Sequence, residues 1–357
     1  MRPLVHIVGA RPNFMKAAPV HAALAARGAP QRLVHTGQHY DEEMSDIFFR
    51  QLGMPEPDVN LGVGSGSHSG QTASLLNALE ADFAAAPPAA VVVYGDVNST
   101  LAAALVCAKE HIPLVHVEAG LRSFDRSMPE EVNRVLTDAV SDLLLVTSPE
   151  AYGHLANEGV DTDKVRFVGN PMIDTLVANR DRFDTDAVRS QLGLEGDYAA
   201  ATLHRPANVD DPDAARELVE ALERVAAELP VVLPLHPRGR DRFREAGLMD
   251  VDGIKVVDPL GYLEFMGLVA GAAVVLTDSG GVQEETTILG VPCLTLRPNT
   301  ERPITITHGT NRLTTTATLL DDVLAVRSGS EDDPEGPPLW DGRAGERIAD
   351  ELQRFIA

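Results

Sequence analysis

The segment AVVVYGDVNSTLAAALVCAKEHIPLVHVE, residues Ala90–Glu118, decides the fold class. It begins with an apolar, β-branched run of strand length, continues with an alanine-rich helical stretch, and ends in a second apolar run. Strands that are apolar on both faces and separated by helices are typical of a parallel sheet that helices cover on both sides. The segment therefore predicts one strand–helix–strand unit of an α/β protein.

The same alternation continues along the whole chain of 357 residues, which is longer than a single core usually grows. It predicts two Rossmann-like, doubly wound domains, residues 1–170 and 171–340, which face a shared cleft. The expected strands of the first half are LVHIV, RLVHT, AVVVYG, PLVHVE, LLLVTS and VRFVG. Those of the second half are YAAATLH, PVVLPLHP, IKVVD, AVVLTDSG and VPCLTLR. In such domains ligands bind beyond the carboxyl ends of the strands.

The overall charge excludes several classes of partner. Asp and Glu number 53 against 30 Lys and Arg, which gives a formal net charge of -23. Such an acidic chain is not expected to bind nucleic acid or an anionic membrane. The chain has no apolar run long enough to span a membrane and no recognisable signal peptide. Cys107 and Cys293 lie in apolar runs typical of reduced, buried thiols, so we expect a cytoplasmic protein.

Acidic and histidine side chains follow several of the predicted strands. Asp96 closes AVVVYGD and Glu118 closes PLVHVE, whereas His204 and His236 end two strands of the second half. Carboxylates at the ends of buried strands suit proton transfer better than surface acids do. Glu130 stands at a predicted helix start, where an acid is by itself more typical of a simple helix cap.

Two strand-to-helix turns are candidates for phosphate binding. GARPNFMK, Gly9–Lys16, carries Arg11 and Lys16 but matches neither the dinucleotide-binding fingerprint nor the P-loop, so an ordinary turn is equally compatible. In TDSGGVQEE, Thr277–Glu285, bare backbone at Gly280 and Gly281 begins a helix whose dipole favours a diphosphate. The alternative there is a routine helix cap.

A metal site is the competing explanation of the many acids. Asp-x-Asp pairs occur at residues 161–163, 184–186 and 250–252, but each lies away from the predicted strand ends. The sequence contains no His-Glu-x-x-His motif and no cysteine pair. No metal is therefore predicted.

Eight motifs, taken together and in this order, resemble the UDP-N-acetylglucosamine 2-epimerase family of the non-hydrolysing type. They are GARPNFMK, GQHYDEEM, GDVNST, HVEAGLRS, MPEEVNR, TLHRPANV, LTDSGGVQEE and TERP. The resemblance runs from Gly9 to the final DGRAGERI segment, and so covers nearly the whole chain. It implies the glycosyltransferase-B type of fold, with a C-terminal helix, 341–357, that packs back on the first domain. It also implies a homodimer that needs no cofactor.

The family resembled here interconverts UDP-GlcNAc and UDP-ManNAc. UDP is eliminated across C1–C2 to leave a 2-acetamidoglucal, and it re-adds after a proton returns to the other face of C2. The resemblance makes Asp96, Glu118 and Glu130 the acid/base candidates and places His204 near the diphosphate. It further implies that the UDP-sugar is held by Arg11, Lys16, His236, Ser279, Gly280, Gly281, Glu285 (ribose), Arg302 and Phe265 (uracil).

The chain departs from the family pattern at two positions. Tyr40 and Pro206 replace charged positions of motifs with which many bacterial members bind UDP-GlcNAc as an activator. Activator dependence is therefore not predicted. The GARPNF and HRPANV variants resemble members that act on related sugars, including 2,3-diacetamido uronic acids. A glycosyltransferase of the same fold, a hydrolysing epimerase and a non-catalytic nucleotide-sugar sensor are the further alternatives.

Overall fold

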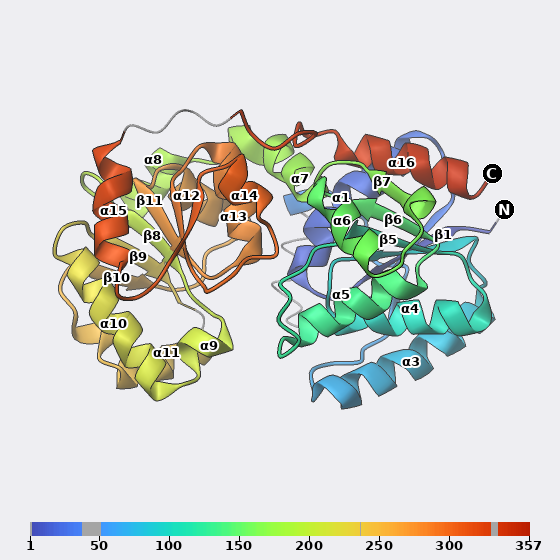
Figure 1. Ribbon diagram of the computed structural model, residues 1–357, viewed down its shortest axis with the longest axis horizontal. Helices are drawn as coiled ribbons and strands as arrows, with labels where there is room; N and C mark the ends of the chain where they lie inside the picture. The colour runs from blue at the N-terminus through green and yellow to red at the C-terminus, as the bar shows by residue number, and fades with distance from the viewer. Residues whose placement is uncertain (1, 38–50, 236, 330–334) are drawn as a thin grey trace. The chain divides into compact units, whose positions relative to one another are not determined.

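The computed structural model describes residues 2–37, 51–235, 237–329 and 335–357 (Figure 1). Contacts within the chain group it into two compact units. The N-terminal unit comprises residues 1–178 and 338–357, and the C-terminal unit comprises residues 179–337. The sequence analysis expects a domain boundary after residue 170, and that boundary stays a prediction. Each unit is described by itself below.

The N-terminal unit contains a parallel sheet of seven described strands in the order β3-β2-β1-β4-β5-β6-β7. The strands are β1 (Leu4–Val8), β2 (Gln31–His35), β3 (Val59–Asn60), β4 (Ala90–Tyr94), β5 (Leu114–Ala119), β6 (Leu143–Val146) and β7 (Val165–Phe167). The helices are α1 (Arg11–Ala26), α3 (His68–Ala85), α4 (Asn98–Glu110), α5 (Pro129–Val140), α6 (Glu150–Asn157), α7 (Pro171–Asn179) and α16 (Ala344–Phe355).

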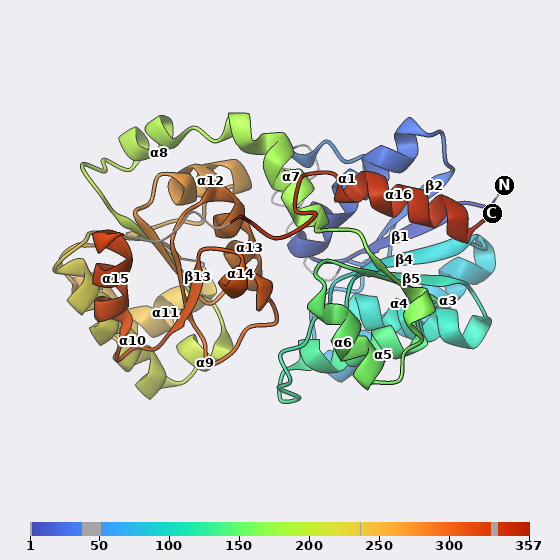
Figure 2. The same cartoon turned by 45° about the horizontal axis from the view of Figure 1, so that its top comes forward.

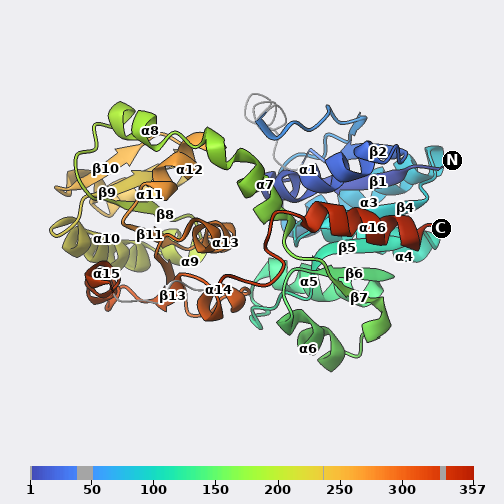
Figure 3. The same cartoon turned by 90° about the horizontal axis from the view of Figure 1, so that it is seen from above.

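Both faces of this sheet are apolar, as a parallel sheet between two helix layers requires. On β4, Val92 and Tyr94 join the core cluster under α1 and α16, whereas Val91 and Val93 join the cluster under α3 and α4. Figure 3 shows α16 beside α1 on one side of the sheet, although the two helices lie at opposite ends of the sequence. The alternation along one strand thus accounts for both helix layers.

The C-terminal unit contains a second parallel sheet, of six described strands in the order β10-β9-β8-β11-β12-β13. The strands are β8 (Ala199–Thr202), β9 (Val231–Pro234), β10 (Ile254–Val257), β11 (Val274–Thr277), β12 (Cys293–Leu296) and β13 (Asn311–Thr314). The helices are α8 (Thr185–Gln191), α9 (Pro206–Val209), α10 (Pro212–Ala226), α11 (Pro237–Glu245), α12 (Tyr262–Ala270), α13 (Gly280–Leu289), α14 (Ile304–Thr307) and α15 (Leu319–Ser328).

One face of this second sheet packs on α10, α11 and α15 through Leu222, Phe243 and Val323. Helices α8 and α12 lie on the other side and contact each other, as Figure 2 shows. In both units the chain starts in the middle of the sheet and reverses its direction of winding there. The predicted fold class, two doubly wound α/β units, is therefore confirmed. The reversals place a switch point between β1 and β4, and another between β8 and β11.

Two strands were not expected from the sequence, β3 and β13. Each lies at an edge of its sheet, and Val59–Asn60 and NRLT lack the continuous apolar run of a central strand. Among the described residues, no helix is both long enough and apolar enough to cross a membrane.

The C-terminal helix α16 is held to the N-terminal unit by the side chain of Asp174 in α7. Its two carboxylate oxygens accept hydrogen bonds from the backbone N–H groups of Ala344 (3.0 Å) and Gly345 (2.6 Å), at the first turn of α16. Burial raises the pKa of Asp174 to about 6, and the two N–H donors only partly oppose this effect.

This raised pKa predicts a pH dependence of stability. Between pH about 4 and about 6 the folded state holds a proton on Asp174 that the unfolded state has lost, so this contribution to stability falls as pH rises through that window. Over this window, the free energy of unfolding of the wild type should fall by up to about 3 kcal/mol more than that of Asp174→Asn. Thermal unfolding of both proteins at several pH values measures this difference, and a pH-independent difference would contradict the prediction.

Candidate active site

The switch point of the N-terminal unit gathers a buried ion pair at the carboxyl ends of three strands. Lys16, one turn into α1, directs its Nζ atom to the Oε2 atom of Glu118 at the end of β5. Both side chains are buried, with 4% and 3% of their surface exposed. Gly95, which follows β4, lies directly against them. A Cβ atom at this position would be 2.8 Å from Lys16 Nζ and 3.0 Å from Glu118 Oε2, so a larger residue would have to displace the ion pair.

The backbone of Glu118 has an unusual conformation. Its φ angle is +72°, in the left-handed region that residues other than glycine rarely adopt. The register between β5 and β6 shifts between Val117 and Ala119, so Glu118 is the extra residue of a β-bulge. Bulges re-aim side chains and occur next to active sites, and strain of this kind gathers at functional positions. The local geometry thus turns the Glu118 carboxylate toward Lys16.

A second carboxylate, Asp96, lies one residue beyond Gly95. Its Oδ2 atom accepts hydrogen bonds from Arg134 Nε (3.0 Å) and Nη2 (2.8 Å). The Arg134 guanidinium also pairs with Glu131, at 2.5 Å, and Glu131 in turn accepts the N–H groups of Ser123 and Phe124. Glu131 and Arg134 thus form an i,i+3 ion pair on α5. The contact between Arg134 and Asp96 was not expected from the sequence.

Glu130, the third acid candidate, is in the first turn of α5, next to Glu131. Its side chain is half-buried, whereas that of Glu131 is 2% exposed. Consecutive residues of a helix point in different directions, so Glu130 does not share the hydrogen bonds of Glu131.

The turn after β1 differs from its expected form. The N–H groups of Gly9 and Ala10 donate to the Asn13 side-chain oxygen at 3.2 and 3.1 Å, so both donors already have an acceptor within the chain. Asn13 also donates to the carbonyl oxygen of Tyr94 at 2.8 Å, which ties the turn to the end of β4. Arg11 begins α1, and its side chain lies outside the described part of the structure.

In the C-terminal unit, a buried aspartate organises the loop after β8. Asp278, which follows β11, accepts the backbone N–H groups of His204 and Arg205 and the side-chain amide of Asn208. The Nδ1 atom of the His204 ring is 3.1 Å from Asp278 Oδ1, while 60% of the His204 side chain is exposed. Burial acts to raise the pKa of Asp278, but the bonds from His204, Arg205 and Asn208 outweigh it and hold the pKa below its usual range. The contact with Asp278 orients the His204 ring so that its Nε2 atom can hydrogen-bond to a ligand.

Helix α13 starts at the other side of the same switch point. Ser279 is its N-cap residue, but its side chain makes no capping hydrogen bond, so the routine-cap alternative is not what the structure shows. The first N–H groups of a helix have no acceptor within it. The Arg302 guanidinium lies against Gly280, where a Cβ atom would be 2.5 Å from Nη1, and Arg302 Nε donates to Glu284 at 2.6 Å. Gly281 follows in the same turn. Positive charge thus adjoins a set of N–H donors.

Two further predicted ligand residues lie nearby in sequence. Glu285 is buried on α13, and burial, with the neighbouring charge of Glu284, raises the pKa of Glu285 to about 8. Tyr262 at the start of α12 interacts with Glu285, and burial raises the pKa of that phenol. Phe265 is half-buried on α12. His236 lies outside the described residues, as does Tyr40 of the activator motif.

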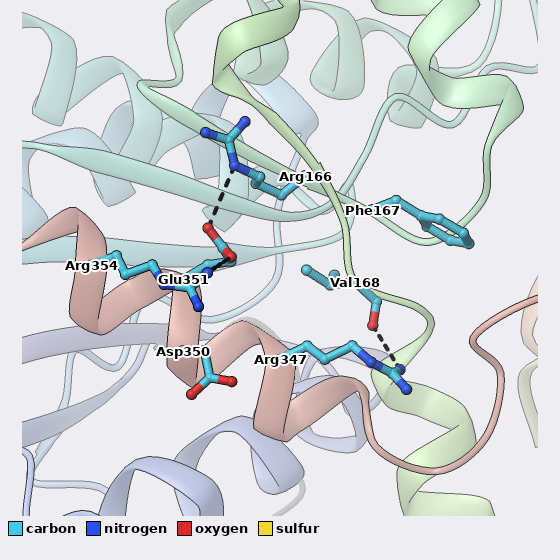
Figure 4. A pocket seen from close by; sticks show the side chains of 7 residues that line it. All are labelled: Arg166, Phe167, Val168, Arg347, Asp350, Glu351 and Arg354. Carbon is cyan, nitrogen blue, oxygen red and sulfur yellow. Dashed lines mark hydrogen bonds and ion pairs between the residues drawn. The ribbon is translucent and has the colours of Figure 1, made fainter.

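The described residues contain no group of three or more His, Cys, Asp or Glu side chains that could hold a metal ion. A surface pocket of about 270 Å³ lies between β7 and α16 (Figure 4). Its charges are already paired: Arg166 and Arg354 contact Glu351, and Arg347 contacts Asp341. A second pocket, of about 430 Å³, adjoins the amino ends of β8, β9 and β10. Neither contains a predicted site residue.

Sequence reasoning missed the side chains that hold the candidate residues in place. These are Asn13, His116, Glu131, Arg134, Asp138, Asn208, Asp278 and Glu301. For Asp278 a signal existed, because it directly follows an apolar strand, as Asp96 and Glu118 do. For Arg134 and Asp138, both on α5, nothing in the spacing pointed to their distant partners.

Two doubly wound units, with acids at one switch point and an uncapped Ser-Gly-Gly helix start at the other, define an α/β enzyme of the glycosyltransferase-B type. A family model described as UDP-N-acetylglucosamine 2-epimerase matches residues 22–353. The chain belongs to the UDP-N-acetylglucosamine 2-epimerase family and is an epimerase, a class of isomerase.

Individual relatives agree. The UDP-N-acetylglucosamine 2-epimerase of Methanocaldococcus jannaschii is 42% identical over 317 residues, which cover 86% of this chain and 87% of the relative. The UDP-2,3-diacetamido-2,3-dideoxy-D-glucuronate 2-epimerase of Pseudomonas aeruginosa is 41% identical over 359 residues, 99% of both chains. The M. jannaschii enzyme solved with UDP-GlcNAc and UDP superposes with a TM-score of 0.91 at 40% identity, over 99% of both chains.

The start of α13 provides a first test of ligand binding. Gly280→Ala places a methyl group against the Arg302 guanidinium and the first-turn N–H groups. We expect UDP binding to weaken about tenfold, the loss of roughly one charge-assisted hydrogen bond. Isothermal titration with UDP measures the change. The control is Gly153→Ala, because Gly153 lies in helix α6 with open space where the methyl group would go. Gly290→Ala would not serve, because the φ angle of Gly290 is +72°. Unchanged UDP affinity in Gly280→Ala would remove this helix start from the binding site.

Proposed function

We propose that the protein interconverts UDP-GlcNAc and UDP-ManNAc by eliminating UDP and adding it back with inversion at C2. The observation that carries this proposal is the pair of carboxylates at one switch point, each held by its own cation: Glu118 by Lys16 and Asp96 by Arg134. An epimerase that works through an alkene intermediate needs a group that takes a proton from C2 and a group that returns one. The epimerase relatives named above support this chemistry.

The proposed reaction balances without an added cofactor. The C1–O bond to UDP breaks, its electron pair leaves with UDP, and the C2 hydrogen passes as a proton to a carboxylate. The C2–H electron pair becomes the C1–C2 double bond of a 2-acetamidoglucal. In the second half, a proton returns to the opposite face of C2 and UDP oxygen re-forms the bond to C1. The hydrogen at C2 of the product therefore comes from a group that exchanges with water.

We assign the acid/base steps to Asp96, Glu118 and Glu130. Arginine stays protonated in proteins and is a poor proton carrier, so Arg134 is assigned to positioning. Lys16 and Arg134 contact Glu118 and Asp96 and hold both carboxylates in place at the switch point.

The C-terminal unit is assigned the leaving group. His204, oriented by Asp278, would give a proton or a hydrogen bond to the departing diphosphate and take it back on return. Ser279, Gly280, Gly281 and Arg302 would hold the diphosphate through N–H donors and charge. Glu285 is assigned to the ribose and Phe265 to the uracil. Arg11, Lys16 and His236 keep their predicted role in holding UDP.

A second substrate class is favoured by one specific observation. The P. aeruginosa relative, named as a 2-epimerase of a UDP-2,3-diacetamido glucuronate, matches 99% of the chain at 41% identity. Parallel assays with UDP-GlcNAc and with that uronate, compared through kcat/KM, decide between the two. A preference for the uronate of tenfold or more, about 1.4 kcal/mol, would make it the substrate.

The direct test uses UDP-GlcNAc and enzyme in deuterated water, followed by proton NMR. UDP-ManNAc should appear, with deuterium at C2 of both sugars. A hydrolysing enzyme would release free ManNAc and UDP instead, and a glycosyltransferase would leave C2 of the donor unlabelled. A nucleotide-sugar sensor would bind UDP-GlcNAc without any exchange at C2.

We also propose that the protein works as a homodimer in the cytoplasm. Cys107 and Cys293 are buried and unpaired, which suits a reducing compartment. Size-exclusion chromatography with light scattering tests the dimer, and a monomeric mass at assay concentrations would contradict it.

A further inference from the structure

A buried histidine lies beneath the two catalytic carboxylates. His116 is on β5, two residues before Glu118, and its ring is fully buried. Its Nε2 atom is 2.8 Å from the carbonyl oxygen of Gly95, the residue before Asp96. Its Nδ1 atom is 2.6 Å from the Oδ1 atom of Asp138 on α5. The ring thus connects the loop that carries Asp96 to the strand that carries Glu118.

The two partners of His116 define its protonation state. A carbonyl oxygen and an ionised carboxylate can each only accept a hydrogen bond. Both ring nitrogens must therefore donate, and an imidazole with two N–H groups is the imidazolium cation. The burial of Asp138 acts to raise its pKa, but His116 and Arg122 outweigh this and lower the pKa of Asp138, which keeps it the acceptor this geometry needs.

Asp138 also holds the segment that follows Glu118. Its Oδ2 atom accepts the backbone N–H of Gly120 at 3.0 Å and pairs with the Arg122 guanidinium at 2.7 Å. One carboxylate thus binds residues on both sides of Glu118, namely His116 before it and Gly120 after it. The strained backbone of Glu118, with φ of +72°, lies between these two attachment points.

We propose that the His116–Asp138 ion pair is a positioning device that holds Asp96 and Glu118 in their reactive geometry, with both ring nitrogens of His116 donating as an imidazolium. The role of this pair in catalysis rests on the proposed function. The protonation state does not, because it is inferred from the acceptor chemistry of the two ring partners.

The charges around the ring are balanced. The Asp138 carboxylate on α5 contacts both His116 and Arg122, and Arg122 lies in the loop between β5 and α5. Arg122 in turn pairs with Glu158 at the end of α6, at 2.6 Å. Two cations and two carboxylates therefore form one neutral chain. At the carboxyl end of β5, Glu118 is neutralised separately by Lys16. Among the described residues, Asp138 is thus the charged group in direct contact with the His116 ring.

Two substitutions separate the functions of the ring. The amide of His116→Gln can still donate toward the Gly95 carbonyl but carries no charge, and we expect kcat to fall about tenfold. The asparagine side chain of His116→Asn is too short to reach Gly95, so the loop that carries Asp96 loses this contact. We expect kcat to fall about a hundredfold, the usual cost of an ångström of misplacement. In both variants KM should change by less than about threefold, because His116 contacts none of the residues assigned to UDP.

His6→Gln is the matched control. His6 is equally buried, on β1 of the same sheet, and bonds Tyr94 Oη (2.7 Å) and Gln31. Its kcat should stay within about threefold of the wild type, even if its melting temperature falls as much as in the His116 variants. A kcat loss in His6→Gln equal to that of the His116 variants would show a merely structural effect and overturn the positioning role.

Nitrogen-15 NMR of histidine-labelled wild type tests the charge without any variant having to fold. His116 should show two protonated ring nitrogens, as its two acceptors require, whereas His6, whose pKa burial lowers to about 3, provides a neutral reference. One unprotonated nitrogen on His116 in the folded protein would overturn the imidazolium. If the wild type exchanges deuterium at C2 and His116→Asn does so at the same rate, the positioning role is overturned and the imidazolium assignment is not. No exchange in the wild type would overturn the proposed function, while the NMR result would still stand.

Discussion

Replacing Glu118 with glutamine is expected to lower kcat by about 10²–10⁴-fold, the usual contribution of a positioned acid or base. Glutamine keeps the size of the side chain but cannot accept the C2 proton. The change also leaves Lys16 as a buried cation without its carboxylate partner. Losing one member of a buried ion pair costs about 3–5 kcal/mol of stability, so activity must be compared below the melting temperature of the variant.

The double variant Lys16→Met/Glu118→Gln separates the two effects. Removing the unpaired cation should restore stability, because replacing both members of a buried pair by uncharged groups is often neutral. Activity should stay low, since the carboxylate is still missing. Solvent deuterium entry at C2, followed by NMR, is the readout for both variants. Near-normal exchange in either of them would take Glu118 out of the mechanism.

Replacing Asp96 with asparagine is expected to produce a loss of the same size, about 10²–10⁴-fold in kcat. Arg134 keeps its 2.5 Å contact with Glu131, so the guanidinium still has a counter-ion and the fold should lose little stability. The effect should therefore appear in catalysis and not in the melting temperature. Comparing the kcat of the epimerisation with thermal unfolding of the same preparation measures both.

Asp82→Asn is the matched control for this substitution. Asp82 on α3 pairs with Arg32 on β2, in the same unit and with a similarly shielded carboxylate. Loss of that ion pair should leave kcat within about threefold of the wild type. If Asp96→Asn behaved like Asp82→Asn, Asp96 would be a structural partner of Arg134 and no part of the proton-transfer machinery.

The strands of both sheets could be predicted because each central strand is a short, continuous apolar run between helices. LVHIV, AVVVY and LLLV are such runs, and all three are buried throughout in the structure. The edge strands β3 and β13 escaped prediction because pairing on one side only lets polar residues remain, as in NRLT. Helix α1 begins at Arg11, because a proline is tolerated in a first helical turn.

The candidate site could be predicted only in part. Asp96 and Glu118 were selected as candidates because a polar residue at the end of an apolar strand stands out in the sequence. Their partners did not stand out: Arg134 lies 38 positions from Asp96, and Lys16 lies 102 positions from Glu118. Contacts over such separations depend on how the helices pack on the sheet. At the turn after β1, the sequence did not indicate that Asn13 would accept hydrogen bonds from the Gly9 and Ala10 N–H groups, so the phosphate site there stays a prediction.

The most direct test of the central claim is the deuterium content at C2 after the wild-type enzyme has equilibrated UDP-GlcNAc in deuterated water. The account predicts that UDP-GlcNAc and UDP-ManNAc are both present and that both carry deuterium at C2, with no free sugar released. UDP-ManNAc that retained the original hydrogen at C2, or a substrate that stayed unlabelled and unconverted, would contradict it.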